Sequence, residues 1–424
     1  MYVFPSSFAR IVFCILSAFF PFISIATCAA MFMAENTLPQ PPHPSAPIAE
    51  HEAQTEHGQA DLFPGKARIR YAKGFTIEYH NTYKKIQVLS PWRDAQVTFT
   101  YLLVPHGQTP PTAPPEAVVV EVPVRRAALT STSSVPFFPM LQIEQALVGF
   151  SGCTRVTTPK VVEMIQQGQV TEIGCGSNGM DRELNMEQLF ALQPDIVITH
   201  GTGIPQFDKH PKLIEAGFRT VIEACHMEST PLGRTEWIKF IAAFFNKEAE
   251  AERLFDEIAM RYEDLAEKMG TVTERPTVLY GMVYRDLWYV AGGKSYHAKF
   301  MADAGADYLW SDDTSTGVMP IGMETVFDRA RDAAFWLNPG ACSSLEELSG
   351  ADERYGAFRA FRTGHVYNNN AKIGPGGGND FWETGMARPD LVLADLISIF
   401  HPDRLPSHQR IWYRQLPLHA EKEN

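Results

Sequence analysis

The stretch Glu236–Gly270, EWIKFIAAFFNKEAEAERLFDEIAMRYEDLAEKMG, decides the fold. Its second half places apolar residues at helical spacing, namely Leu254, Ile258, Tyr262, Leu265 and Met269. From Asn246 to Met269 such a helix would be about 35 Å long at about 1.5 Å per residue, which is the width of a lobe. The pattern therefore predicts one long helix that joins two separate bodies.

On both sides of this helix, short apolar runs alternate with helical segments. The expected strands include AVVVEVPV, which begins this alternating part, then VTEIG and DIVITH before the helix and TVLYGMV after it. The expected helices include PMLQIEQAL, NMEQLFALQ and HPKLIEAG. Alternation at this spacing favours parallel βαβ units. We therefore predict the fold class α/β, with two Rossmann-like lobes bridged by one long helix and preceded by a β-rich extension. The expected ranges are 66–120 for the extension, 121–232 for the N-terminal lobe, 233–270 for the bridging segment, 271–410 for the C-terminal lobe and 411–424 for a tail.

The first 28 residues resemble a secretory signal, with Arg10 followed by a nearly unbroken apolar run that ends in small residues. Ile25-Ala26-Thr27-Cys28 resembles a lipobox, so Cys28 is the expected lipidation site; cleavage to a free periplasmic protein and an uncleaved membrane helix are the alternatives. Residues 29–65 are rich in Pro, His, Gln and Glu, which predicts a disordered linker. The expected location is the periplasm or the extracytoplasmic membrane surface.

Length and charge limit the function. A chain of 424 residues exceeds one ordinary core. The net charge of -12 argues against nucleic acid as a partner and gives no support for binding to an anionic membrane surface. We expect contact with the membrane only through a lipid anchor, and a monomeric protein.

Gly174, Gly176 and Gly179 form the G-x-G-x-x-G pattern of a dinucleotide-binding turn. A true turn of this kind needs its third glycine inside the first helical turn and an acid at the end of the next strand. Here the helical run begins near Asn185, and His200 occupies the strand end. We therefore expect no NAD or FAD, and interpret the glycines as a loop that lets backbone approach a bulky ligand. The cluster Gly374–Gly378 is interpreted as a flexible loop.

Enzyme and metal motifs are also missing from the sequence. It contains no G-x-S-x-G, H-E-x-x-H, Walker lysine or C-x-x-C. Four cysteines remain after the signal and Cys28 are set aside, and their disulfide pairing is open: Cys153, Cys175, Cys225 and Cys342. We predict no covalently bound cofactor, no resident metal and no enzymatic activity.

Several stretches resemble the periplasmic substrate-binding proteins of ABC importers for iron-siderophores and cobalamin. They include NMEQLFALQPDIVITHGTG, YVAGGKSYHAKFMADAGADYLWSDD and GGNDFWETGMARPDLVLADLISIFHPDRLP, and together they cover most of residues 120–410. The resemblance implies two α/β lobes on one rigid helix, a metal chelate as ligand and an ABC permease as partner. It also implies one exposed docking glutamate on each lobe, which matches Glu187 in Asn-Met-Glu and Glu324 in Gly-Met-Glu.

In parallel α/β lobes, ligands bind outside the carboxyl ends of the strands, so residues that follow each strand should face the cleft between the lobes. Aromatic residues mixed with Arg, Lys and amides suit a large chelate such as a ferric siderophore or a corrinoid. The candidate ligand-binding residues are Thr132, Ser133, Phe137, Phe138, Asn178, His200, Thr202, His226, Met227, Tyr284, Arg285, Trp288, Lys294, Tyr296, Trp310 and Trp382.

The predicted function is therefore capture of an iron-siderophore or similar metal chelate, and its delivery to an ABC permease. Three alternatives remain open. The first is a cobalamin receptor of the same class. The second is a receptor for bare Zn or Mn ions, which would need three or four converging His, Asp or Glu side chains. The third is a metallocluster enzyme on the same scaffold, for which Cys153 and Cys175 are the nearest pair.

Overall fold

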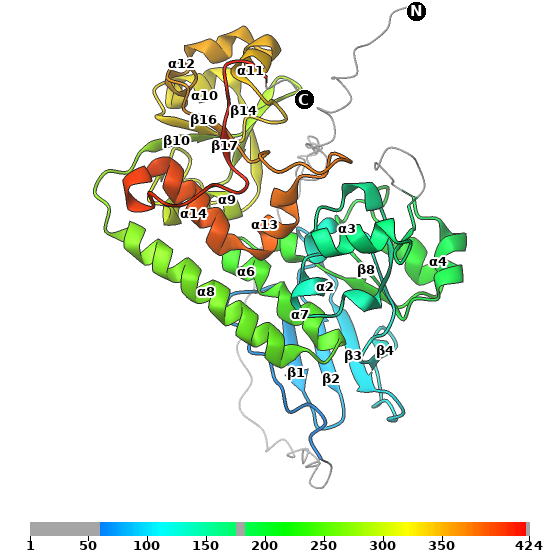
Figure 1. Ribbon diagram of the computed structural model, residues 1–424. Coiled ribbons are helices and arrows are strands. Elements are labelled where there is room, and N and C mark those ends of the chain that lie inside the picture. Colours follow the sequence, from blue (N-terminus) through cyan, green and yellow to red (C-terminus); the bar gives the residue numbers. More distant parts are fainter. Residues whose placement is uncertain (1–59, 175–182, 421–424) are drawn as a thin grey trace, which may run out of the picture.

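The computed structural model describes residues 60–174 and 183–420, and Figure 1 shows their arrangement. Two α/β lobes are joined by helix α8 (Glu248–Gly270), and a β-sheet formed by the N-terminal extension packs beneath the first lobe. The fold class predicted from the sequence is confirmed. Within the described ranges, no helix combines the length and the apolarity that crossing a membrane requires.

Helix α8 carries acidic residues at its beginning and a basic residue at its end. Glu248 and Glu250 lie in its first turn and Lys268 in its last, which complements the helix dipole. Its buried face packs against α7 (Trp237–Phe244), α9 (Tyr296–Asp303) and α14 (Pro389–Phe400). The helix does not extend back to Glu236, because the chain turns at Asn246, which has φ 55°. The preceding part forms α7 and the short helix α6 (Pro231–Thr235).

The N-terminal lobe contains a five-stranded sheet in the order β7-β6-β5-β8-β9, with every pair parallel. Its strands are β5 (Ala127–Leu129), β6 (Leu147–Phe150), β7 (Thr171–Glu172), β8 (Ile196–Thr199) and β9 (Thr220–Ile222). Its helices are α2 (Phe137–Met140), α3 (Pro159–Gln166), α4 (Met186–Leu192) and α5 (His210–Glu215). The segment PMLQIEQAL, predicted as one helix, contributes only Pro139 and Met140 to α2 and then forms a 3-10 turn at Glu144–Ala146.

The C-terminal lobe contains a sheet in the order β13-β10-β15-β16-β17, which is parallel except for β17. These strands are β10 (Thr277–Tyr280), β13 (Asp307–Tyr308), β15 (Phe335–Leu337), β16 (Val366–Asn368) and β17 (Arg414–Gln415). The remaining helices are α10 (Met323–Ala330), α11 (Leu345–Ala351), α12 (Arg359–Arg362) and α13 (Thr384–Ala387). A separate antiparallel sheet contains β11 (Met282–Tyr284), β12 (Leu287–Ala291) and β14 (Val318–Gly322).

The extension forms a four-stranded sheet in the order β1-β2-β3-β4. Its strands are β1 (Phe75–Tyr79), β2 (Lys84–Val88), β3 (Phe99–Pro105) and β4 (Val118–Val122). The run AVVVEVPV was expected to begin the alternating α/β part. Instead β4 pairs in parallel with β3, and the lobe sheet begins at β5.

Buried carboxylates attach the extension to the bridging segment. Glu236 is fully buried and accepts hydrogen bonds of 2.6–3.1 Å from the backbone N–H groups of residues 70–72. Glu228 accepts hydrogen bonds from the N–H groups of residues 73 and 74. A buried charge is stabilised only when its hydrogen bonds are made, so these contacts fix the path of the chain from residue 70 to residue 74.

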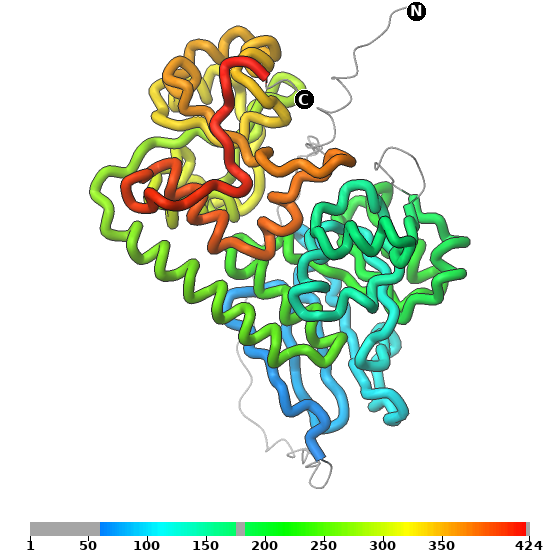
Figure 2. Tube along the Cα trace, in the orientation of Figure 1, coloured from blue at the N-terminus to red at the C-terminus, as the bar shows by residue number. Residues whose placement is uncertain are grey.

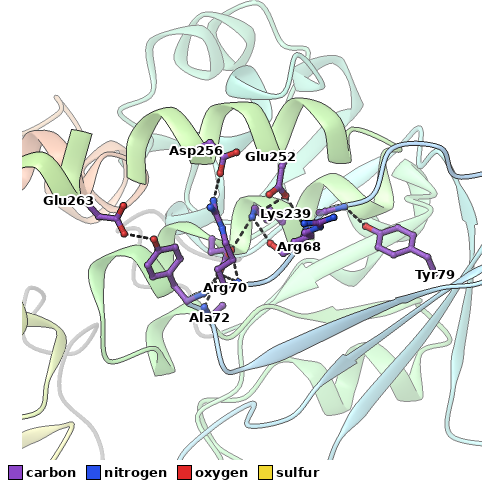
Figure 3. A network of polar contacts seen from close by, with 11 residues as sticks. Arg68, Arg70, Ala72, Tyr79, Lys239, Glu252, Asp256 and Glu263 are labelled. Atoms are coloured by element: carbon purple, nitrogen blue, oxygen red, sulfur yellow. Dashed lines mark hydrogen bonds and ion pairs between the residues drawn. The ribbon is translucent and has the colours of Figure 1, made fainter. Parts of the chain in front are cut away.

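Cationic groups complete this network, which Figure 3 shows from close by. The buried Lys239 donates to the carbonyl of Arg68 at 2.6 Å and forms ion pairs of 3.0 Å with Glu236 and Glu252. Further along α8, Arg70 pairs with Asp256, and the hydroxyl of Tyr71 bonds to Glu263. Residues 68–71 therefore run alongside α8 and brace the helix that separates the lobes.

Two neighbouring lysines in β2 test how much such buried contacts stabilise the protein. Lys84 is fully buried and pairs with Glu248 at 2.5 Å, whereas Lys85 pairs with the exposed Glu78. We expect Lys84→Ala to lower the free energy of unfolding by about 3 to 5 kcal/mol, because it leaves a carboxylate buried without its partner. Lys85→Ala should cost about 1 kcal/mol or less. Denaturant unfolding of both variants measures the difference, and equal losses would contradict a structural role for Lys84.

Candidate ligand-binding site between the lobes

Polar and aromatic side chains from both lobes meet where the parallel strands end. His200 follows β8 and His226 lies beyond β9, while Tyr280 ends β10 and Asn338 follows β15. The bridging segment and the C-terminal lobe add the other members. We call the following residues the interlobe cluster: His200, His226, Arg234, Tyr280, Tyr296, His297, Asn338 and Trp382.

Arg234 of α6 connects the two lobes within this cluster. Its Nε and one terminal nitrogen donate 3.0 Å hydrogen bonds to the carbonyls of Glu228 and His226. The guanidinium carbon lies 3.9 Å from the centre of the Tyr296 ring, in cation–π geometry. Contacts with two carbonyls and one ring hold the guanidinium in place without neutralising its charge.

His297 lies among aromatic rings of the C-terminal lobe. Its ring centre is 4.7 Å from that of Tyr280, 5.1 Å from that of Tyr296 and 5.8 Å from that of Trp382. On the opposite lobe the rings of His200 and His226 are 6.1 Å apart. Imidazole and aromatic rings of both lobes therefore lie around the guanidinium of Arg234.

The histidines of the cluster are neutral at neutral pH. Removal from bulk solvent and, to a smaller extent, the charge of Arg234 lower the pKa of His297 to about 3. Desolvation between the lobes, His200 and Arg234 together lower the pKa of His226 to about 3, although part of this side chain is exposed. The pKa of His200 is also lowered, mainly by desolvation. Each neutral ring keeps one nitrogen that donates and one that accepts a hydrogen bond.

Two polar atoms of the cluster are buried without a hydrogen-bond partner among the described residues. They are Nδ1 of His200 and the side-chain oxygen of Asn338. Because buried polar atoms are normally hydrogen-bonded, both mark positions where a ligand or a water molecule would bond.

A loop of the C-terminal lobe reaches across to the N-terminal lobe, as the orange trace in Figure 2 shows. A methyl group on Gly376 would lie 1.9 Å from the carbonyl oxygen of Thr154, and one on Gly378 would lie 1.8 Å from that of Arg155. Glycine is therefore required for this approach of two backbones. The interpretation of Gly374–Gly378 as a free loop is wrong, because the loop packs against the opposite lobe.

The same contact includes a buried carboxylate. Glu383 accepts hydrogen bonds from the N–H groups of Thr157 and Thr158, directly before α3. Burial raises the pKa of Glu383, and the hydrogen bonds from Thr158 and Thr157 oppose that shift. This contact and α8 together link the two lobes.

Several predicted ligand residues belong to the interlobe cluster or lie beside it. His200, His226, Tyr296 and Trp382 are members, although the Tyr296 ring is only 2% exposed. Half-buried positions in the same strand-end loops are occupied by Thr132, Ser133, Thr202 and Met227, and Lys294 is exposed just before α9. Asn178, like Cys28 and Cys175, lies outside the described residues.

Other predicted ligand residues lie outside the interlobe cluster. Phe137, Phe138, Trp288 and Trp310 are buried in the core, where Trp288 packs on Trp336 at 5.2 Å. Tyr284 and Arg285 lie at the β11–β12 turn of the separate antiparallel sheet. The expected strand TVLYGMV is divided at Gly281, which has φ 96°, so the strand end facing the other lobe is Tyr280.

Four members of the cluster were not predicted: Arg234, Tyr280, His297 and Asn338. Ligands bind at the carboxyl ends of parallel strands, and this rule identifies Tyr280 and Asn338 if the last residues of β10 and β15 are known. Arg234 and His297 lie in helices, and nothing in their local sequence distinguishes them from surface residues.

Metal-binding geometry is limited in the described part of the chain. Residues 60–174 and 183–420 contain no group of three or more His, Cys, Asp or Glu side chains that could hold an ion. Cys153, Cys225 and Cys342 form no disulfide with one another. Burial raises the pKa of the Cys225 thiol well above its ordinary value, so it stays protonated.

The predicted docking glutamates occupy equivalent positions in the two lobes. Glu187 is exposed in the first turn of α4, where Asn185 caps the helix by accepting from the N–H of Gln188. Glu324 is exposed in the first turn of α10, whose N-cap is Gly322. An acid in the first turn is favoured by the helix dipole in any protein, so this position alone does not assign a partner.

The chain belongs to the periplasmic binding protein family, whose model matches residues 128–373. The match covers more than half of the chain, and the observed fold also has two lobes joined by one helix. The family consists of solute-binding proteins, which confirms the prediction of an extracytoplasmic binding protein and not an enzyme.

The chain is also similar to relatives and to a solved structure. An uncharacterized lipoprotein of Methanocaldococcus jannaschii is 28% identical over 67% of this chain and 67% of its own, and a second is 26% identical over 84% and 88%. A possible iron-binding periplasmic solute-binding protein of Staphylococcus epidermidis superposes with TM-score 0.51 at 17% identity, covering 66% of this chain and 99% of that one. At this identity the likeness supports the fold alone.

Replacing His297 by Gln should reduce the dependence of stability on pH. The folded-state pKa of about 3 lies below the ordinary value of 6.5. Below the ordinary pKa the unfolded chain binds a proton that the folded protein does not. The folded protein is therefore favoured most strongly above pH 6.5, where His297 is neutral in both states. It loses stability as the pH falls toward 3, because protonation of His297 then favours the unfolded chain.

The slope of the free energy of unfolding against pH should differ between wild type and His297→Gln by at most about 1.4 kcal/mol per pH unit. Urea unfolding of the two proteins at several pH values between about 5 and about 7 measures it. Identical slopes would show that His297 is not held neutral by its surroundings.

Proposed function

We propose that this binding protein captures an anionic, partly apolar metal chelate of the ferric-siderophore type between its lobes and delivers it to an ABC permease. The observation that supports the proposal best is the interlobe cluster, in which one fixed guanidinium is surrounded by neutral imidazoles and aromatic rings. The protein would act as a monomer, attached to the membrane by lipid on Cys28. The naming of two relatives as lipoproteins supports that anchor.

The chemistry of the cluster favours a chelate over a bare ion. A bare Zn or Mn ion requires several converging charged or imidazole ligands, and the described residues contain no group of three. A chelate brings its own ligands and presents an outer surface of polar atoms and hydrocarbon. Arg234, held against the buried Tyr296 ring, then pairs with its negative charge, and Tyr280 and Trp382 contact its apolar parts.

Cobalamin is the second candidate within the same class. Aromatic side chains such as Trp382 suit a flat corrin ring equally well. Cobalamin carries amides in place of carboxylate arms, but the phosphodiester of its nucleotide loop is an anion that Arg234 could also bind. Direct titration with cobalamin and with ferric siderophores therefore distinguishes the two ligands.

The first test is binding by the purified protein. We expect quenching of tryptophan fluorescence by at least one ferric siderophore, because Trp382 lies in the cluster. Native mass spectrometry of protein isolated from its own cells should reveal the same chelate. Absence of binding to ferric catecholates, ferric hydroxamates, haem and cobalamin would contradict the proposed ligand class.

Arg234→Gln should weaken binding of an anionic ferric chelate about 10-fold or more, since a fixed charge-assisted contact is lost. Arg219→Gln is the matched control, because Arg219 also donates to a backbone carbonyl, that of Val119, but lies before β9 at the opposite end of the strand. Calorimetric titration compares the three proteins. If both variants bind as tightly as wild type, Arg234 does not contact the ligand.

Docking to the permease is tested separately. The double variant Glu187→Ala, Glu324→Ala should bind ligand as wild type does, while its stimulation of permease ATPase activity falls about 10-fold. Glu267→Ala changes an exposed glutamate on α8 and serves as control. A loss of ligand affinity in the double variant would place these acids in the ligand site instead.

A further inference from the structure

The β-rich extension contributes a loop that contacts both lobes. This loop, residues 89–98, connects β2 to β3. On the N-terminal lobe, Trp92 stacks on His210 at 5.3 Å and packs against Gly201 and Gly203, directly after His200. A methyl group on Gly201 would lie 2.5 Å from the Trp92 ring, so only glycine permits this contact.

On the C-terminal lobe the same loop reaches Gly317, directly before β14. A methyl group on Gly317 would lie 2.0 Å from a terminal nitrogen of Arg93, so the guanidinium lies directly against this glycine. The carbonyl of Gly317 accepts a 2.7 Å hydrogen bond from Gly292, three residues before the N-cap Ser295 of α9. Helix α9 carries Tyr296 and His297.

We propose that residues 89–98 form a third wall of the interlobe site, in which Arg93 is a ligand-binding cation that selects chelates carrying several negative charges. This inference rests on the proposed function. It differs from it in assigning part of the site to the extension, which lies outside the residues matched by the family model.

The environment of Arg93 supports a role in binding. Its side chain is exposed and forms no hydrogen bond or ion pair with any described residue. The neighbouring Trp92 packs against Gly201 and Gly203, which holds the backbone next to Arg93 against the N-terminal lobe. Asp94 has φ 58°, which turns the chain directly after Arg93.

Two cations then approach the site from different elements. Arg234 comes from the bridging segment, and Arg93 comes from the extension. A ligand with one charge needs only one of them, whereas a ferric tris-catecholate, which is trianionic, can pair with both. A ferric tris-hydroxamate is neutral and should be indifferent to Arg93.

The loops on the N-terminal sheet explain how the third wall is placed. The order β6-β5-β8 puts the loop after β5 between the loops after β6 and β8. The glycine loop of the C-terminal lobe covers the chain after β6, at Thr154 and Arg155, and Trp92 covers the loop after β8. The central position, after β5, is thus flanked on both sides by segments from outside the lobe.

The test compares wild type, Arg93→Ala, Arg93→Lys and Arg125→Ala by calorimetric titration with a ferric tris-catecholate and a ferric tris-hydroxamate. Arg125 is an exposed arginine before β5, at the opposite end of the sheet, and is the matched control. We expect Arg93→Ala to weaken binding of the catecholate about 10-fold and of the hydroxamate less than about 2-fold. Arg93→Lys should restore part of the catecholate affinity, and Arg125→Ala should have no effect.

The outcomes separate the two proposals. If wild type binds the catecholate and Arg93→Ala binds it equally well, the third wall is overturned and the proposed function stands. An equal loss with both chelates would overturn the charge selection by Arg93. If wild type binds neither these chelates nor any ligand found by native mass spectrometry, the proposed function fails and the inference fails with it.

Discussion

Burial of the carboxylates of Glu228 and Glu236 is the constraint on which the rest of the structure depends. These two side chains accept the backbone N–H groups of residues 70–74, and the buried Lys239 compensates part of their charge. A buried charge is tolerated only if its hydrogen bonds are made, so the extension cannot detach without a large energetic cost. The extension is therefore an integral part of the protein, and it braces the beginning of the bridging segment.

The site follows from this constraint. Arg234 lies between Glu228 and Glu236 in the chain, and its guanidinium bonds to the carbonyl of Glu228. The network that holds the extension thus also holds Arg234, which contacts both lobes. Helix α8 sets the separation of the lobes, and the contact of Glu383 with residues 157 and 158 joins them a second time. Two links of this kind favour a small closing movement over a large hinge rotation.

Sequence patterns predicted the elements better than the site. The periodicity of Leu254 to Met269 identified α8, because one apolar stripe on a long helix is a local property. A residue of the site was predicted where the end of its strand was predicted correctly, as for His200 after β8. The error at Gly281 moved the expected site to Tyr284, since periodicity does not reveal where one sheet ends and another begins. Trp288 shows the same limit, because a tryptophan in a strand pattern suits a core and a ligand equally well.

The sequence by itself determined the two lobes, the long helix, the extracytoplasmic class and the exposure of acids such as Glu187, because these depend on composition, spacing and local helix chemistry. Only the tertiary structure decided that β4 joins the extension, that the loop at Gly376 crosses to the other lobe, and that Arg234 and His297 meet. These features arise from contacts between residues far apart in the chain. Their energies depend on burial and on hydrogen-bond partners, which no local pattern of residues records.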